Sequence, residues 1–122
     1  MTSHKRWAGR TIIVIAIVHT VFGFLAFGPV IGDIVQSGLW DSVGEDPMRG
    51  AVAWFLFAGF FMATTGLPVD ALEACSANAN FRAVAIALLI TAILGIVMMP
   101  VSGFWLLLVP AIGLLLKKER AQ

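Results

Sequence analysis

The feature that most constrains this chain is an apolar run from Thr11 to Gly32 that contains no charged side chain. A helix rises about 1.5 Å per residue, and crossing the roughly 30 Å hydrocarbon core of a bilayer takes about 20 apolar residues. The run is therefore long enough for a membrane-spanning helix. It is also about twice as long as the apolar core of a cleavable signal peptide, so we expect it to remain in the mature protein.

The composition agrees with a membrane protein. Of the 122 residues, 60% are hydrophobic and 12% are charged, and the mean hydropathy is +0.96. Soluble domains carry about 25% charged residues, and a soluble fold of this length cannot bury so much apolar surface. We therefore expect one integral membrane domain, residues 1–122, with the bilayer as the solvent for most of its surface.

The apolar stretches predict an all-α fold, a bundle of four transmembrane helices at about 11–32, 50–69, 81–99 and 102–118. The stretch Ala83–Leu116 is too long for one helix. Pro100 and Gly103 divide it, because proline removes a helix N–H group and glycine relaxes the backbone. The alternative is one kinked helix and three spans in all. Pro29 and Pro110 are expected to kink the first and fourth helices.

The distribution of charge predicts the orientation of these helices. Basic residues stay on the cytoplasmic side of a membrane, and here they gather near both ends of the chain: Lys5, Arg6 and Arg10, then Lys117, Lys118 and Arg120. Both termini are therefore predicted to be cytoplasmic, which favours four spans over three. The acidic loop Asp33–Arg49 and the turn between the third and fourth helices are predicted outside. The expected location is the plasma (inner) membrane of a bacterium, with several passes.

The loop Asp70–Arg82 is then predicted to lie inside. Asp70 and Glu73 are expected to solvate this loop and to cap the helix that follows it. Cys75 lies in the same loop, and a single cysteine excludes an internal disulfide.

Small residues are expected to bring the helices together, because lipid tails solvate leucine as well as another leucine does. The candidates for helix packing are Gly23, Gly59, Ala63, Ala87, Thr91 and Gly95. Ala87, Thr91 and Gly95 are spaced four apart and so share one helix face. This pattern fits ordinary close packing or a specific dimer-forming motif. The expected partners are the lipid bilayer and a second copy or another membrane subunit, with no nucleic acid.

His19 lies near the middle of the first predicted span, where ionisable groups are rare and mark a functional site or a polar contact between helices. Three roles fit it. It hydrogen-bonds a hydroxyl or a free carbonyl on another helix, with Thr64, Thr65, Thr91 or Ser102 as candidate partners. Alternatively it is a cofactor-binding residue that ligates haem. In the third role it moves protons or substrate, or contacts a quinone head group.

No catalytic set is visible in the sequence. It contains no Ser-His-Asp arrangement, no glycine-rich phosphate loop, no metal-spaced histidines and no carboxylate inside a predicted span. We therefore expect a non-enzymatic membrane protein that acts as an interaction or assembly subunit. The alternatives are a haem- or quinone-binding protein that uses His19, and a small transporter or channel with His19 in its pathway.

Four short motifs carry a resemblance to a known family: Trp7-Ala8-Gly9, His19 followed by Gly23, Ala53-Trp54-Phe55 and the segment Pro100–Trp105. With these motifs the chain resembles an uncharacterised family of small bacterial four-helix integral membrane proteins. The resemblance implies the fold and no activity. The chain is also similar in size to the small multidrug resistance transporters. Those proteins carry an essential glutamate in the first helix where this chain has His19, so their antiport activity is not expected.

Overall fold

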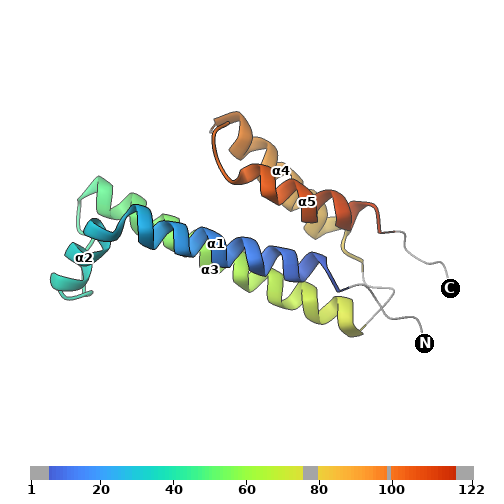
Figure 1. Ribbon diagram of the computed structural model, residues 1–122, viewed down its shortest axis with the longest axis horizontal. Coiled ribbons are helices and arrows are strands. Elements are labelled where there is room, and N and C mark those ends of the chain that lie inside the picture. The colour runs from blue at the N-terminus through green and yellow to red at the C-terminus, as the bar shows by residue number, and fades with distance from the viewer. Residues whose placement is uncertain (1–5, 76–79, 99, 118–122) are drawn as a thin grey trace.

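The computed structural model of the chain describes residues 6–75, 80–98 and 100–117. In these residues it contains five α-helices and no strand: α1 (Ala8–Ala26), α2 (Gly28–Gln36), α3 (Pro47–Cys75), α4 (Arg82–Met98) and α5 (Phe104–Leu115). The all-α prediction is confirmed for this part of the chain. Figure 1 shows two antiparallel pairs, α1 beside α3 and α4 beside α5, with α2 at the far end of the first pair.

The α1–α3 pair is held together by small residues spaced seven apart. Gly9, Ala16 and Gly23 are buried on α1, and Gly59 and Gly66 are buried on α3. A seven-residue repeat keeps one seam of a helix facing its neighbour over several turns. The helices approach so closely that a Cβ atom added at Gly66 would lie 3.1 Å from the carbonyl oxygen of Gly9.

The stretch predicted as one helix from 11 to 32 is two helices in the structure. The chain bends at Phe27, between the end of α1 at Ala26 and the start of α2 at Gly28. Pro29 explains the bend, because it has no N–H group to continue α1 and fits well in the first turn of a new helix. At Pro29 the expected kink is therefore an interruption of the helix, with separate helices before and after it.

The prediction that the second helix ends at about residue 69 is wrong. Pro68 lies inside α3, which continues to Cys75. The last turns stay helical because Val69 and Glu73 are packed against other helices, with exposures of 2% each. Asp70 and Glu73 thus lie on a helix and not in the solvated loop expected for them, and Cys75 is the last residue of α3 and is exposed.

The α4–α5 pair begins and ends close to the predicted bounds. The Asn80 side chain accepts a hydrogen bond of 2.9 Å from the Arg82 amide at the start of α4. The predicted end of the third helix, Met99, lies outside the described residues. At the other side of the turn, α5 starts at Phe104, whose ring lies over Gly95 and fills the place of a Cβ atom there.

The two pairs of helices meet at one end only. Among the described residues, the backbones of α1 and α5 approach each other there, and side chains of α3 and α4 complete the junction. The buried cluster at this junction contains Ala8, Val69, Phe81, Ala85 and Leu114. Away from the junction the two pairs diverge (Figure 1).

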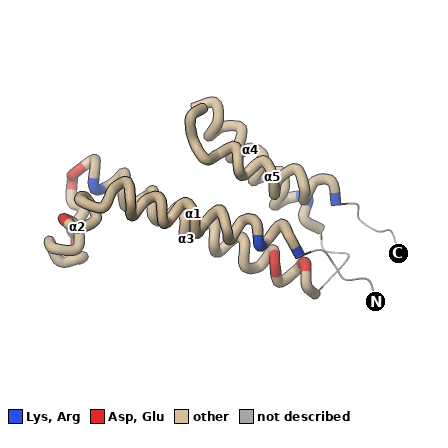
Figure 2. The backbone as a smooth tube through the Cα atoms, viewed as in Figure 1, with Lys and Arg blue, Asp and Glu red and all other residues tan. Residues whose placement is uncertain are grey.

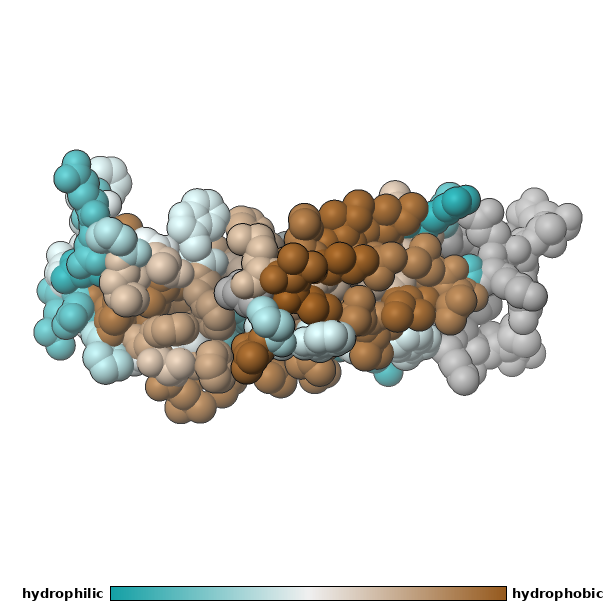
Figure 3. All heavy atoms as spheres, turned by 90° about the horizontal axis from the view of Figure 1, so that it is seen from above, coloured by the Kyte–Doolittle hydropathy of each residue, from teal (hydrophilic) through white to brown (hydrophobic). Residues whose placement is uncertain are grey.

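The surface is apolar in the middle and charged at the ends. Figure 2 shows the charged residues of the described chain at the two ends of the molecule, and Figure 3 shows a broad hydrophobic face between them. Within the described residues, two helices, α1 and α3, have the length and composition to cross a membrane, and α4 and α5 are shorter apolar helices.

Candidate functional site

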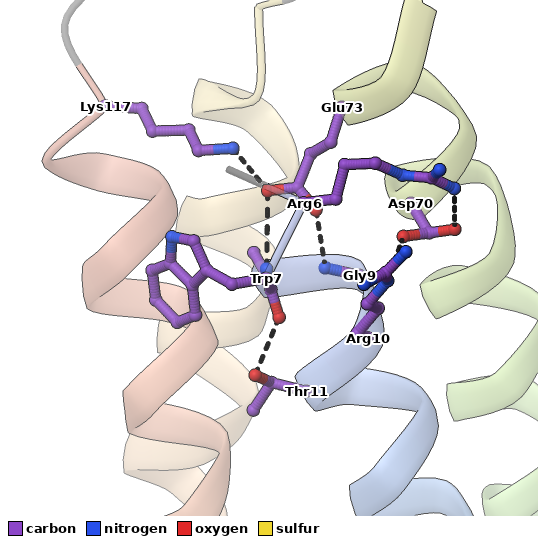
Figure 4. A network of polar contacts seen from close by, with 9 residues as sticks. Arg6, Trp7, Gly9, Arg10, Thr11, Asp70, Glu73 and Lys117 are labelled. Atoms are coloured by element: carbon purple, nitrogen blue, oxygen red, sulfur yellow. Dashed lines mark hydrogen bonds and ion pairs between the residues drawn. The ribbon is translucent and has the colours of Figure 1, made fainter. Parts of the chain in front are cut away.

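Five charged residues from three parts of the chain meet at the junction of the two helix pairs. We call them the ion-pair cluster: Arg6, Arg10, Asp70, Glu73 and Lys117 (Figure 4). Arg6 precedes α1 and Arg10 lies in its first turn, the two carboxylates come from the end of α3, and Lys117 follows α5. The cluster therefore joins the ends of three helices.

Glu73 is at the centre of the cluster, and its side chain is 0% exposed. Its Oε2 accepts a hydrogen bond of 2.9 Å from the Gly9 amide, and its Oε1 accepts one of 3.3 Å from the Ala8 amide. The first amides of a helix have no partner within the helix, and they attract negative charge. The N-cap residue Trp7 supplies no side-chain hydrogen bond. Glu73 of α3 therefore caps the N-terminus of α1.

Lys117 balances the charge of Glu73 and connects it to α5. The ammonium group donates a hydrogen bond to Glu73 Oε1 and lies 5.0 Å from the centre of the Phe81 ring. A cation close to a helix C-terminus and over an aromatic face is stabilised in both positions. A buried carboxylate is costly without a partner of opposite charge. Lys117 supplies that charge to Glu73, and the contact ties the end of α5 to the end of α3.

Asp70 holds the second half of the cluster. Its Oδ2 accepts a hydrogen bond of 2.6 Å from Arg6, and its Oδ1 lies 3.4 Å from Nε of Arg10. The backbones of α1 and α3 touch here, since a Cβ atom added at Gly9 would lie 2.2 Å from the Asp70 nitrogen. Glycine at position 9 is what allows the carboxylate to reach both guanidinium groups.

The contacts of the ion-pair cluster connect the ends of three helices. Glu73 accepts hydrogen bonds from α1 and from Lys117, and Asp70 accepts one from Arg6 and forms an ion pair with Arg10, so each contact crosses from one segment to another. The sequence analysis did not find this site, because it placed Asp70 and Glu73 in a solvated loop. The spacing held a partial signal: Asp70 and Glu73 are three apart, so that both lie on one face of a helix.

His19 joins α1 to the middle of α3. Its Nε2 lies 2.8 Å from the backbone oxygen of Phe55, and its ring stacks on the Phe55 ring with the centres 4.0 Å apart and the planes at 16°. A carbonyl oxygen only accepts, so Nε2 carries the proton and donates it. Gly59 makes room for this contact, because a Cβ atom there would lie 3.2 Å from the His19 ring.

Three of the four hydroxyl partners expected for His19 are engaged elsewhere. Thr64 and Thr65 both donate to the Phe61 carbonyl on their own helix, and Thr91 donates to the Ala87 carbonyl on α4. The sequence analysis expected either a hydroxyl or a carbonyl on another helix as the partner of His19. In the structure the partner is a carbonyl, that of Phe55 on α3.

The six residues predicted to pack helices divide into two groups. Gly23, Gly59 and Gly95 are buried where another segment approaches closely: Gly23 lies against Phe55, and Gly95 lies under Phe104. Ala63 is half-buried, and Ala87 and Thr91 are exposed. The small residues buried on α4 are Ala85, Ala92 and Gly95.

The loop between α2 and α3 is organised around Arg49, which lies in the first turn of α3. Arg49 donates hydrogen bonds to the Ser42 carbonyl at 2.7 Å and to the Ser37 hydroxyl at 3.2 Å. Asp46 caps α3 by accepting from the amides of Met48 and Arg49 at 2.9 and 3.2 Å. Asp33, predicted as the first residue of this loop, lies in α2.

Comparison with known proteins places the chain in a family. Residues 3–121 match the family of unknown function DUF6463, which agrees with the expected resemblance to an uncharacterised family. Neither the curated proteins nor the solved structures contain a significant match to the chain.

Proposed function

Since the chain belongs to the DUF6463 family, to which no function is assigned, we propose its function from its geometry: it is a small integral membrane protein that acts non-enzymatically, as an interaction or assembly subunit. One observation carries the proposal. The most apolar parts of α1 and α3 are only 28% and 22% buried within the chain. Surface of this kind requires lipid or other helices as its neighbours.

The arrangement of charge supports a multi-pass membrane protein with four membrane-embedded helices. The ion-pair cluster lies at one end of the α1–α3 pair, and the acidic loop with Asp46 lies at the other (Figure 2). The end that carries the basic residues is the cytoplasmic one under the positive-inside rule. We therefore place both termini in the cytoplasm and the protein in the plasma membrane of a bacterium.

The position of His19 favours an assembly subunit over a cofactor-binding or transport protein. Its Nε2 donates to the Phe55 carbonyl and its ring lies on the Phe55 ring. A haem ligand or proton carrier uses one of the two ring nitrogens, and the hydrogen bond to Phe55 leaves only Nδ1 for that purpose. With Nε2 engaged in the α1–α3 contact, the geometry supports the packing role.

The exposed small residues of α4 indicate where a partner binds. Ala87 and Thr91 are exposed one turn apart on one face of α4, and no helix of the described chain covers them. Small residues at such positions let two helices approach closely in lipid. We take a second copy of this chain as the partner.

The test is energy transfer between copies in vesicles. Cys75 is exposed and is the one cysteine of the chain, so donor and acceptor dyes attach at a single position. Transfer in the unmodified protein should exceed the level that random mixing gives at the same protein-to-lipid ratio. Ala87→Leu combined with Thr91→Leu should reduce it toward that level, because the larger side chains separate the helices.

Ile93→Phe is the matched control. Ile93 is 49% exposed and lies on the opposite side of α4 from Ala87 and Thr91, so the added bulk should leave energy transfer unchanged. Transfer at the random level in the unmodified protein would contradict self-association. An equal loss in the control and in the double variant would contradict the Ala87–Thr91 face.

A further inference from the structure

The turn between α4 and α5 is largely apolar and exposed. We call it the hairpin tip: Val97, Met98, Pro100, Val101 and Trp105. Met98 is 78% exposed, Val101 is 100% exposed and Trp105 is 54% exposed. A turn that emerges into water is normally built from polar residues. This one presents its largest apolar side chains to whatever surrounds it.

The α4–α5 pair is too short to carry this tip across a bilayer. The 12 residues of α5 and the 17 residues of α4 correspond to about 18 and 26 Å of helix. Both lengths fall below the roughly 30 Å of the hydrocarbon core. In Figure 1 the turn ends level with the middle of the α1–α3 pair and not with the α2 end.

Three hydrogen bonds are formed between residues of the hairpin tip and those next to it. The Trp105 indole donates to the Pro100 carbonyl at 2.9 Å, and Ser102 Oγ accepts from the Phe104 amide at 3.4 Å. The Leu106 amide donates to the Gly103 carbonyl at 3.0 Å. Pro100 has no N–H group to satisfy.

Internal pairing of this kind is what hydrocarbon requires, because water is not present there to bind free backbone groups. An indole placed at the membrane–water interface normally directs its N–H toward head groups or water. Trp105 directs it back into the turn. Three observations therefore favour hydrocarbon as the surroundings of the turn: the composition of the tip, the lengths of the helices and the internal hydrogen bonds.

We propose that the α4–α5 hairpin enters the bilayer from the cytoplasmic side, turns inside the hydrocarbon and returns, so that the hairpin tip contacts lipid acyl chains. This inference rests on the proposed membrane location. It replaces the expectation that the turn lies outside, and it keeps both termini on one side. The chain then crosses the membrane completely only with α1 and α3.

Cysteine labelling tests the position of the tip. In a Cys75→Ser background, Val101→Cys is compared with Glu45→Cys, which lies in the exposed loop before α3. A membrane-impermeant maleimide is applied to the outside of intact cells. Thiolates form poorly away from water, so we expect the Val101→Cys variant to react at least about tenfold more slowly than the Glu45→Cys variant. Equal rates would overturn the proposal.

Depth-dependent quenching separates this proposal from the membrane location itself. A bimane dye is attached at each engineered cysteine, and the protein is reconstituted with lipids that carry a nitroxide deep in the acyl chain or on the head group. The dye at position 101 should be quenched most by the deep nitroxide, and the dye at position 45 by aqueous iodide.

Two contrary outcomes have different meanings. Quenching at position 101 by the head-group nitroxide and by iodide would overturn only the buried tip, because the protein would still be in the membrane. If neither dye responded to either lipid nitroxide, the membrane location would fall and the tip proposal with it.

Discussion

The Gly9 amide on α1 donates a hydrogen bond of 2.9 Å to Oε2 of Glu73 on α3. A carboxylate near the end of one helix thereby caps the beginning of another, although the two residues are 64 positions apart in the chain. Lys117 binds the same carboxylate from the end of α5. One buried side chain therefore fixes the relative positions of three helix ends, and the α4–α5 hairpin is anchored at this end of the molecule (Figure 4).

The first prediction concerns Glu73→Gln. The amide side chain keeps an acceptor oxygen but loses the charge, and its NH₂ group meets the donors at Gly9, Ala8 or Lys117. We expect the free energy of unfolding to fall by about 1–3 kcal/mol, the cost of weakening buried hydrogen bonds to a charged group. The measurement is an SDS titration in mixed micelles followed by circular dichroism.

Lys117→Met supplies the comparison. The Lys117 side chain is 30% exposed. Without it, Glu73 keeps its hydrogen bonds from the two amides at the start of α1. In the Glu73→Gln background, Lys117→Met should cost less than it does alone, because the two residues act as a pair. Additive effects of the two substitutions would show that the ion pair contributes no coupling.

The second prediction concerns the contact of the α1 and α3 backbones. In Gly9→Ala the new Cβ atom would lie 2.2 Å from the Asp70 nitrogen, so the helices must separate. Overpacking of this kind costs about 1–3 kcal/mol, and we expect a loss of this size in the same titration. Gly32→Ala is the control, because no atom lies within 4 Å of its added Cβ. Alanine there should be neutral or stabilising by up to about 1 kcal/mol. A loss of stability in the control as large as in Gly9→Ala would mean that the close approach is not the cause.

The helices themselves follow largely from the sequence, but several of their ends do not. Apolar runs predict helices because lipid or protein must cover them, and this requirement does not depend on tertiary contacts. The continuation of α3 past Pro68 does depend on them, because Glu73 binds residues that are distant in the chain. Local propensity predicts a stop at the proline, and long-range contacts override it.

The candidate site was predicted only in part for the same reason. The sequence singles out His19 as a polar residue in an apolar run, and the structure pairs it with a backbone carbonyl. A backbone carbonyl is present at every residue, so no sequence pattern identifies the one at Phe55 as its partner. The seven-residue spacing of Gly9, Ala16 and Gly23 was open to recognition in the sequence. It identifies the α1 face that contacts α3, whereas spacing of four alone led to Ala87 and Thr91, which are exposed.

The third prediction separates the packing role of His19 from a role in chemistry. His19→Phe keeps an aromatic ring to stack on Phe55 and loses the hydrogen bond of 2.8 Å to its carbonyl. Polar contacts between membrane helices contribute about 0.6 to 2 kcal/mol, and we expect a loss of stability in that range. His19→Ala should lose more, because the stacking is lost as well.

The proton position of His19 is open to direct measurement. Histidine labelled with ¹⁵N, in a His4→Gln background that leaves His19 as the one histidine, should show a protonated Nε2 in the nitrogen spectrum. An unprotonated Nε2 would contradict the hydrogen bond to Phe55, since a carbonyl oxygen has no proton to give.

The fourth prediction concerns the contact by which the two helix pairs meet. A Cβ atom added at Gly113 on α5 would lie 1.9 Å from the Trp7 ring at the start of α1. Gly113→Ala should therefore destabilise the protein by about 1–3 kcal/mol. Trp7→Phe removes the part of the indole that occupies this space, and in that background the same alanine should cost much less. The coupling, measured by a double-mutant cycle in the SDS titration, should be about 0.5–3 kcal/mol, as for residues in direct contact. Gly103→Ala controls for the general effect of alanine, since no atom lies within 4 Å of its added Cβ. A coupling of zero would mean that Trp7 does not lie against Gly113, and the α1–α5 contact would then have to be formed by other residues.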